Sequence, residues 1–234
     1  MRASIIIAVS FTLSSACAAS TPTPTTIPPE HQSVAGEQSA AAAHDRAGGA
    51  LERQAASETG PAKCGPPAAG APGQICWTST RTSGAASSEL MRAATERDAA
   101  AQHRRVSQAL RDAETMACAG ISQEDMTHSP FAHRDDIVDA QVIEGPAGVL
   151  GARVRFHELS NLTADWLQHV VDCHVARDNA LGHEVPEMGY CPLVPRGASA
   201  VVTAVPHGYV VEVRSNDPDG AREIARRAKA LVAE

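Results

Sequence analysis

The segment ARVRFHELSNLTADWLQHVVDCHVAR, residues 152–177, carries the clearest signals of secondary structure in the chain. It opens with alternation, because Ala152, Val154 and Phe156 are apolar while the residues between them are arginines. A period of two is typical of a half-buried strand. Thr163 then offers a cap for a helix that we expect to reach about residue 177. Its apolar face consists of Trp166, Leu167, Val170 and Val171.

The pattern of two strands and a helix occurs twice in the C-terminal part. Ile137–Ile143 is a candidate strand, and a turn at 144–148 connects it to the strand described above. Val201–Val205 and Tyr209–Val213 then form a predicted hairpin, and Asp217-Pro218 is a strong helix start. Two such units predict an α+β fold with a four-stranded, mostly antiparallel sheet, in the order ββαββα, with helices on one face.

This order of elements resembles part of a ferredoxin-like fold in its β-α-β-β-α portion. The resemblance is topological and concerns residues 137–234 alone. Metal-binding and peptide-binding domains both use that fold, so the resemblance implies an architecture and does not decide a function.

A long helix is predicted before the sheet, over residues 86–119. Val106, Leu110 and Ala113 follow helical spacing, and Gly120 ends the pattern. The apolar stripe of this helix is mostly alanine. We expect it to lie against the C-terminal part or to pair with another chain, so the globular domain is expected to cover residues 86–234.

The N-terminus has the anatomy of an export signal. Ile5–Leu13 is an apolar run that follows a positive start and is too short to cross a bilayer. The segment LSSAC at 13–17 resembles the lipobox of bacterial lipoproteins, which implies a signal over residues 1–17 and a lipid on Cys17. Cleavage at Ala18 would instead give a secreted or periplasmic protein. We therefore expect the protein to be exported and to be anchored by its lipid to the membrane of the cell envelope.

Residues 18–85 are predicted to form a disordered tether. They are rich in Ala, Pro, Gly, Ser and Thr and nearly free of large apolar side chains. Such a segment cannot bury enough surface to offset the entropy lost on ordering. The one local exception is a Pro/Gly loop that a disulfide between Cys64 and Cys76 would close.

Five cysteines remain if Cys17 is lipidated, and an odd number leaves one of them unpaired. Beside the local pair, Cys118, Cys173 and Cys191 offer one more disulfide. We favour Cys173–Cys191, because that bond would fasten the long loop after residue 177 to the preceding helix. Cys118 would then be an inert buried thiol, a soft metal ligand or a bridge to another chain.

Histidine and cysteine side chains gather in three segments, at 121–136, 163–177 and 182–191. Imidazole and thiolate are the preferred ligands of copper and zinc, so a transition-metal site is one hypothesis. The candidate ligands are His128, His133, His169, Cys173, His174 and Cys118. The spacing within 121–136 does not place its histidines on one helix face, so a solvated polar loop is the alternative interpretation.

His174 falls near the centre of the apolar face of the predicted 163–177 helix. A buried imidazole must be neutral and hydrogen-bonded, or it must bind something. It is therefore either a core histidine, bonded to a backbone carbonyl or an aspartate of the 121–136 loop, or a metal ligand.

Charge and missing motifs exclude several functions. The net charge of −7 argues against a nucleic-acid partner, as does export. The chain has no G-x-S-x-G, H-E-x-x-H, P-loop or dinucleotide fingerprint. We expect a non-enzymatic envelope lipoprotein whose small domain binds a ligand or a partner, with copper or zinc as the most specific hypothesis. The alternatives are a disulfide-stabilised structural or interaction protein without metal, and an unrecognised cysteine or histidine hydrolase.

Overall fold

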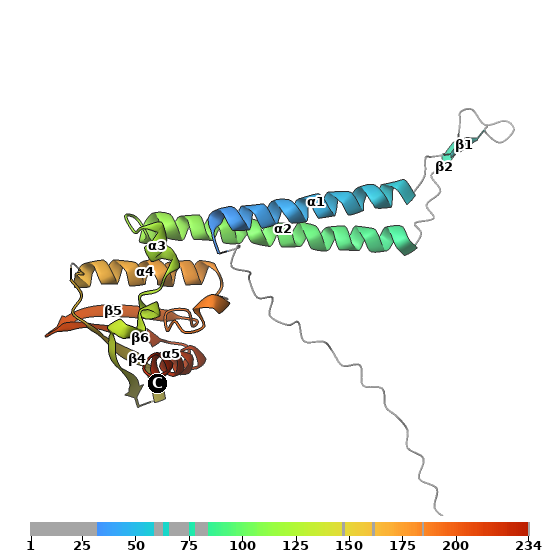
Figure 1. The fold of residues 1–234 in the computed structure, drawn as a ribbon. Coiled ribbons are helices and arrows are strands. Elements are labelled where there is room, and N and C mark those ends of the chain that lie inside the picture. The colour runs from blue at the N-terminus through green and yellow to red at the C-terminus, as the bar shows by residue number, and fades with distance from the viewer. Residues whose placement is uncertain are drawn as a thin grey trace, which may run out of the picture.

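The chain combines a long helical hairpin with a layered domain of sheet and helices (Figure 1). The structure is a computed structural model that describes residues 32–58, 63–65, 75–77, 84–146, 148–160, 162–183 and 185–233. The hairpin consists of α1 (Val34–Glu58) and α2 (Gly84–Ala117), which run side by side. The short elements that follow α2 are α3 (Gln123–Thr127), η2 (Pro130–Ala132) and η3 (Arg134–Asp136).

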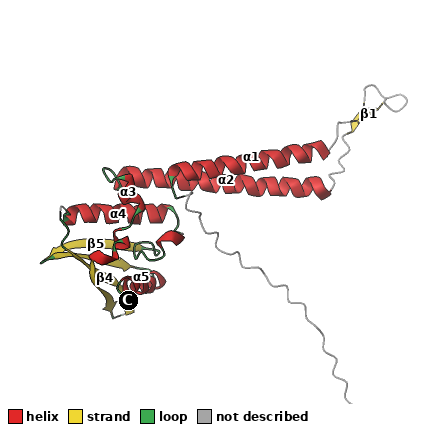
Figure 2. Ribbon diagram, in the orientation of Figure 1, coloured by secondary structure: helices red, strands yellow, loops and turns green. Residues whose placement is uncertain are grey.

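The domain is built on a four-stranded antiparallel sheet in the order β3-β4-β6-β5. Its strands are β3 (Ile137–Gly145), β4 (Gly148–His157), β5 (Ala198–Val205) and β6 (Gly208–Ser215). Its helices are α4 (Ala164–Ala180), the single turn η4 (Pro186–Met188) and α5 (Pro218–Leu231). Figure 2 shows these strands in yellow and the helices around them in red. The α+β fold with the order ββαββα, predicted from the sequence, is confirmed.

One face of the sheet carries the core. α4 packs along β5, while α5 packs across β3, β4 and β6. The strand residues beneath the helices are buried and apolar, namely Ala152, Val154, Phe156, Val211 and Val213. On the opposite face Arg153 pairs with Glu212 at 2.7 Å, and Arg155 pairs with Asp139 at 2.6 Å. The alternation in residues 152–157 therefore separates core from solvent.

Local sequence explains where these elements begin and how closely they meet. Thr163 accepts a hydrogen bond from the first turn of α4, and Asp217 does the same for α5, where Pro218 takes the first position. Gly208 has φ of +155°, and a Cβ there would lie 1.9 Å from the carbonyl oxygen of Phe156. Glycine is therefore required at this position, where β6 starts against β4.

The helix α1 shows that the predicted disordered tether over residues 18–85 is wrong for residues 34–58. Small buried residues recur every seven positions along both helices of the hairpin: Ala41, Gly48 and Ala55 on α1, and Ala86, Ala93 and Ala100 on α2. These small residues allow the two helices to approach each other closely, since a Cβ on Gly48 would lie 3.4 Å from the Ala93 carbonyl oxygen. The prediction failed because it counted only large apolar side chains as able to order a segment.

Several predictions concern residues outside the described part. These are the signal at 1–17, the lipidation of Cys17 and the side-chain bond between Cys64 and Cys76. The backbones of β1 (Lys63–Gly65) and β2 (Ile75–Trp77) pair antiparallel, with Cys64 opposite Cys76. Within the described residues, no helix combines the length and the apolar character needed to cross a membrane.

Candidate functional site

A disulfide fastens the hairpin to the domain. Cys118, which follows α2, is bonded to Cys173 on α4, with their Cα atoms 4.7 Å apart. Both residues are buried against Ile121 and Val170. The predicted Cys173–Cys191 bond is therefore wrong, and neither Cys118 nor Cys173 has a thiolate to offer a metal. The pairing was missed because Cys173 faces the end of α2, and the sequence does not show how those two helices cross.

Cys191 is the free cysteine of the described region, and it is fully buried. Its Sγ lies 3.1 Å from the Oγ of Ser129. Burial raises the pKa of this thiol to about 12. Since the thiolate is the form that attacks substrates and binds metals, Cys191 acts as a core side chain.

His174 is also buried, with 1% of its surface exposed. Its Nε2 lies 2.8 Å from the carbonyl oxygen of Asp125, to which it donates a hydrogen bond. Burial lowers the pKa of this imidazole, and the bond to the carbonyl opposes that effect. This is the geometry of a core histidine bonded to the backbone of the 121–136 loop. The neutral ring holds α3 against α4.

The remaining histidines of the predicted metal set lie on two elements, α4 and the segment before the sheet. His169 is half-buried on α4, where its ring meets the Trp166 ring edge-on at a centroid distance of 6.2 Å. His128 and His133 are exposed on the segment before the sheet. In the parts of the chain that the structure describes, no three His, Cys, Asp or Glu side chains form a group able to hold a metal ion. The six predicted ligands are therefore not brought together.

A pocket of about 410 Å³ opens between α4 and the segment 121–136. A volume of this size is in the range of sites that bind small molecules. Its walls come from the end of β4, the loop that follows, α4 and η2. The apolar residues that line it are Phe156, Leu159, Leu162, Trp166, Leu167, Val170 and Pro130.

The polar residues that line this pocket all come from the segment 121–136. They are Glu124, Asp125, His128, His133 and Asp136. No lysine or arginine is among the described residues that line it. The pocket is therefore amphipathic, with apolar walls on the side of the domain and carboxylate and imidazole groups on the other side.

Side-chain caps and one aromatic anchor fix the polar side of the pocket. Ser122 accepts a hydrogen bond from the backbone of α3, and Ser129 does so for η2. Phe131 in η2 is fully buried and packs edge-on against Phe156, with ring centroids 5.4 Å apart. The backbone that carries the carboxylates is thus held by the same core that supplies the apolar wall.

Asp178 on α4 is a buried carboxyl outside the pocket lining. Burial raises its pKa to about 7, while Arg177 and Arg227 act in the opposite direction. Its Oδ2 has no hydrogen-bond partner among the described residues. Nothing in the sequence marks this group, because an aspartate near a helix end is ordinarily exposed.

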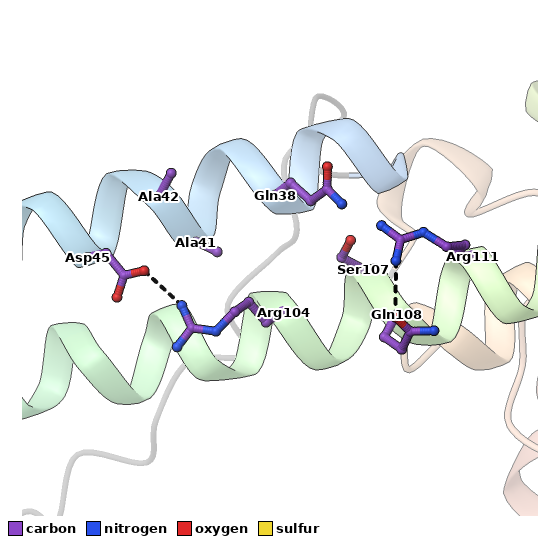
Figure 3. A pocket seen from close by; sticks show the side chains of 8 residues that line it. All are labelled: Gln38, Ala41, Ala42, Asp45, Arg104, Ser107, Gln108 and Arg111. Atoms are coloured by element: carbon purple, nitrogen blue, oxygen red, sulfur yellow. Dashed lines mark hydrogen bonds and ion pairs between the residues drawn. The ribbon is translucent and has the colours of Figure 1, made fainter.

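A second hollow, of about 390 Å³, lies along the hairpin between α1 and α2 (Figure 3). Here Arg104 pairs with Asp45 at 2.8 Å, and Arg111 donates a hydrogen bond to Gln108 at 3.1 Å. The other lining residues are small or uncharged, namely Gln38, Ala41, Ala42 and Ser107. The charged groups of this hollow already bond to its own lining, so the pocket beside α4 is the better candidate for a ligand.

Comparison with protein-family models, curated protein sequences and solved structures gives no match. The residues that line the pocket are therefore the evidence from which a function is proposed. Histidine and cysteine positions had marked the loop at 121–136 and the helix at 163–177, and both contribute to it. The apolar wall from Phe156, Leu159 and Leu162 was missed, since it depends on how the loop folds over α4.

Proposed function

We propose that this protein is a non-enzymatic lipoprotein of the bacterial cell envelope that binds a small amphipathic ligand in the pocket between α4 and residues 121–136. The export-like residues 1–17 and the lipobox-like Cys17 support a lipid anchor, with release into the periplasm as the outcome if cleavage falls at Ala18. The negative net charge of −7 supports a partner other than nucleic acid.

The lining of the pocket is the observation that carries this proposal. Leu159 and Leu162 are only partly buried, and Trp166 keeps 36% of its surface exposed. Apolar surface left in contact with water is unfavourable by about 25 cal/mol per Å². A ligand with an apolar body would remove that surface from water, while its polar end would meet the groups of residues 121–136.

The positions of the candidate ligands do not favour a metal site. Two of its six ligands form a disulfide, and His174 donates to a backbone carbonyl. A hydrolase is not favoured either, because the one free thiol of the described region is buried and has a raised pKa. Binding without chemistry agrees best with a pocket whose described lining residues carry neither a thiol nor a hydroxyl.

Trp166 provides a direct test of ligand binding. The chain has two tryptophans, so in a Trp77→Phe variant all tryptophan fluorescence comes from the pocket wall. We expect 4-butylbenzyl alcohol to change the emission of this variant, purified from the envelope, in a saturable manner. Calorimetry on the unmodified chain should give the same affinity.

A pair of leucine variants tests whether the pocket is responsible. Leu159→Ala removes part of the apolar wall and should weaken the alcohol several-fold, since each buried CH₂ contributes about 0.8 kcal/mol. Leu90→Ala changes a residue that is 49% exposed on α2 and should leave the affinity unchanged. The proposed function is wrong if charged and neutral versions of this probe all fail to bind.

A further inference from the structure

We propose that the ligand is an organic cation, with an ammonium-type group on an apolar body. This inference rests on the proposed function, because it concerns the same pocket. It is carried by the combination of an apolar wall with carboxylates that no arginine or lysine neutralises within the described lining.

The charge of the lining favours a positive ligand. Glu124, Asp125 and Asp136 contribute three carboxylates, against two imidazoles and no lysine or arginine. Opposite charges attract more strongly where the surroundings are partly apolar, and like charges across an interface are costly. An anion would meet repulsion here, and a neutral ligand would leave the carboxylates without a counter-charge.

Two of these carboxylates differ from several others in the domain, which are paired with arginines. Glu212 and Glu223 each bond to two arginines, and Asp139 bonds to Arg155. By contrast, within the described residues Glu124 and Asp136 form no side-chain hydrogen bond or ion pair.

Asp125 accepts one side-chain bond, from the hydroxyl of Ser122 at 2.7 Å. Glu124 and Asp136 are therefore free to receive an ammonium group, whereas arginines already engage Asp139, Glu212 and Glu223.

The apolar wall selects an organic cation over a bare one. A metal ion gains nothing from Leu159, Leu162 and Leu167, and the described residues offer it no group of three ligands. An alkyl or aryl body would bury these side chains, and the exposed ring of Trp166 could also attract a positive charge over its face.

A series of probes that share one apolar body separates charge from shape. The probes are 4-butylbenzylammonium, 4-butylbenzyl alcohol and 4-butylbenzoate, titrated into the Trp77→Phe chain at low salt. We expect the ammonium to bind about fivefold more tightly than the alcohol, and the benzoate to bind most weakly. Added salt should reduce the preference for the ammonium, because it screens the exposed carboxylates.

A charge-removal variant identifies the groups responsible. In Glu124→Gln/Asp136→Asn the ammonium should lose its preference of about fivefold over the alcohol, because the amides still accept a hydrogen bond but no longer supply a counter-charge. The matched control is Glu144→Gln/Asp98→Asn, which changes the same residue types at exposed positions outside the pocket. That control should keep the preference, and saturable binding of the alcohol shows that both variants fold.

The outcomes distinguish the two proposals. Equal binding of all three probes, or a preference that survives Glu124→Gln/Asp136→Asn, overturns the cation and leaves the ligand pocket standing. Failure of all three probes to bind overturns the pocket, and the cation with it.

Discussion

The hairpin and the α+β domain are stabilised by different means. The domain buries large side chains, including Phe131, Leu193 and Ile224, each at most 1% exposed. The interface of the hairpin instead buries small residues such as Ala41 and Ala100. Since hydrophobic stabilisation scales with the apolar area buried, each alanine contributes less than each of those larger residues.

Polar contacts across the hairpin add to what its alanines provide. His103 bonds to the buried Glu37 at 2.7 Å, and His44 bonds to Glu96 at the same distance. Arg97 reaches both Asp45 and Glu52 on the opposite helix. The hairpin therefore depends on the close approach of its two helices and on its disulfide to the domain. The domain, by contrast, has a large enough apolar core to support a pocket.

Removing the bond between the two regions should have the largest effect. Cys118 and Cys173 are 55 residues apart in the sequence, and a bond that closes such a loop stabilises a protein by about 4 kcal/mol. Cys118→Ser/Cys173→Ser should lower the free energy of unfolding, measured in urea, by about this amount. Reduction of the disulfide in the unmodified chain should lower it to a similar extent. Equal stability with and without the bond would show that packing alone joins hairpin and domain.

The domain should show a pH dependence that arises from Asp178. Burial raises its pKa from 3.8 to about 7, so the fold favours the neutral carboxyl. Its contribution is fully present below about pH 4 and is lost as pH rises to about 7, a loss of about 4 kcal/mol. Asp178→Asn cannot ionise, so this variant should be more stable than the unmodified chain at pH 8 and comparable at pH 4.

Urea unfolding between pH 4 and pH 8 measures this difference. Asp172→Asn, on the exposed side of the same helix, serves as the control and should keep the slope of the unmodified chain. The assignment to Asp178 fails if its variant also keeps that slope.

A larger residue in the hairpin should have a smaller effect that is confined to it. Ala100 is 0% exposed, and Ala100→Leu should separate α1 from α2 at a cost of about 1–3 kcal/mol. Amide hydrogen exchange should quicken in α1 and stay slow in β4 and β6. Ala94→Leu, at an exposed position of α2, should change neither region. Loss of protection in the sheet as well would mean that the two regions unfold together.

The contrast between the domain and the hairpin also explains which parts of the fold could be predicted from the sequence. The alternation at residues 152–156 and the caps Thr163 and Asp217 are local signals, and the predicted strands and helices follow from them. α1 was missed because an alanine-rich segment becomes a stable helix here only through its partner α2.

The candidate site was predictable only in part. The loop at 121–136 and the helix at 163–177 stood out through their histidines and cysteines, and both line the pocket. The Cys118–Cys173 pairing and the contribution of Leu159 depend on how distant elements meet in space. Short-range periodicity carries no information of that kind.

Binding of an organic cation in the pocket beside α4 can be followed by the indole N–H signal of Trp166 in a ¹⁵N-labelled Trp77→Phe chain. Adding 4-butylbenzylammonium should shift this signal, because Trp166 lines the pocket. 4-Butylbenzoate at the same concentration should leave it in place. An unmoved Trp166 signal, or equal shifts with the ammonium and the benzoate, would contradict the account.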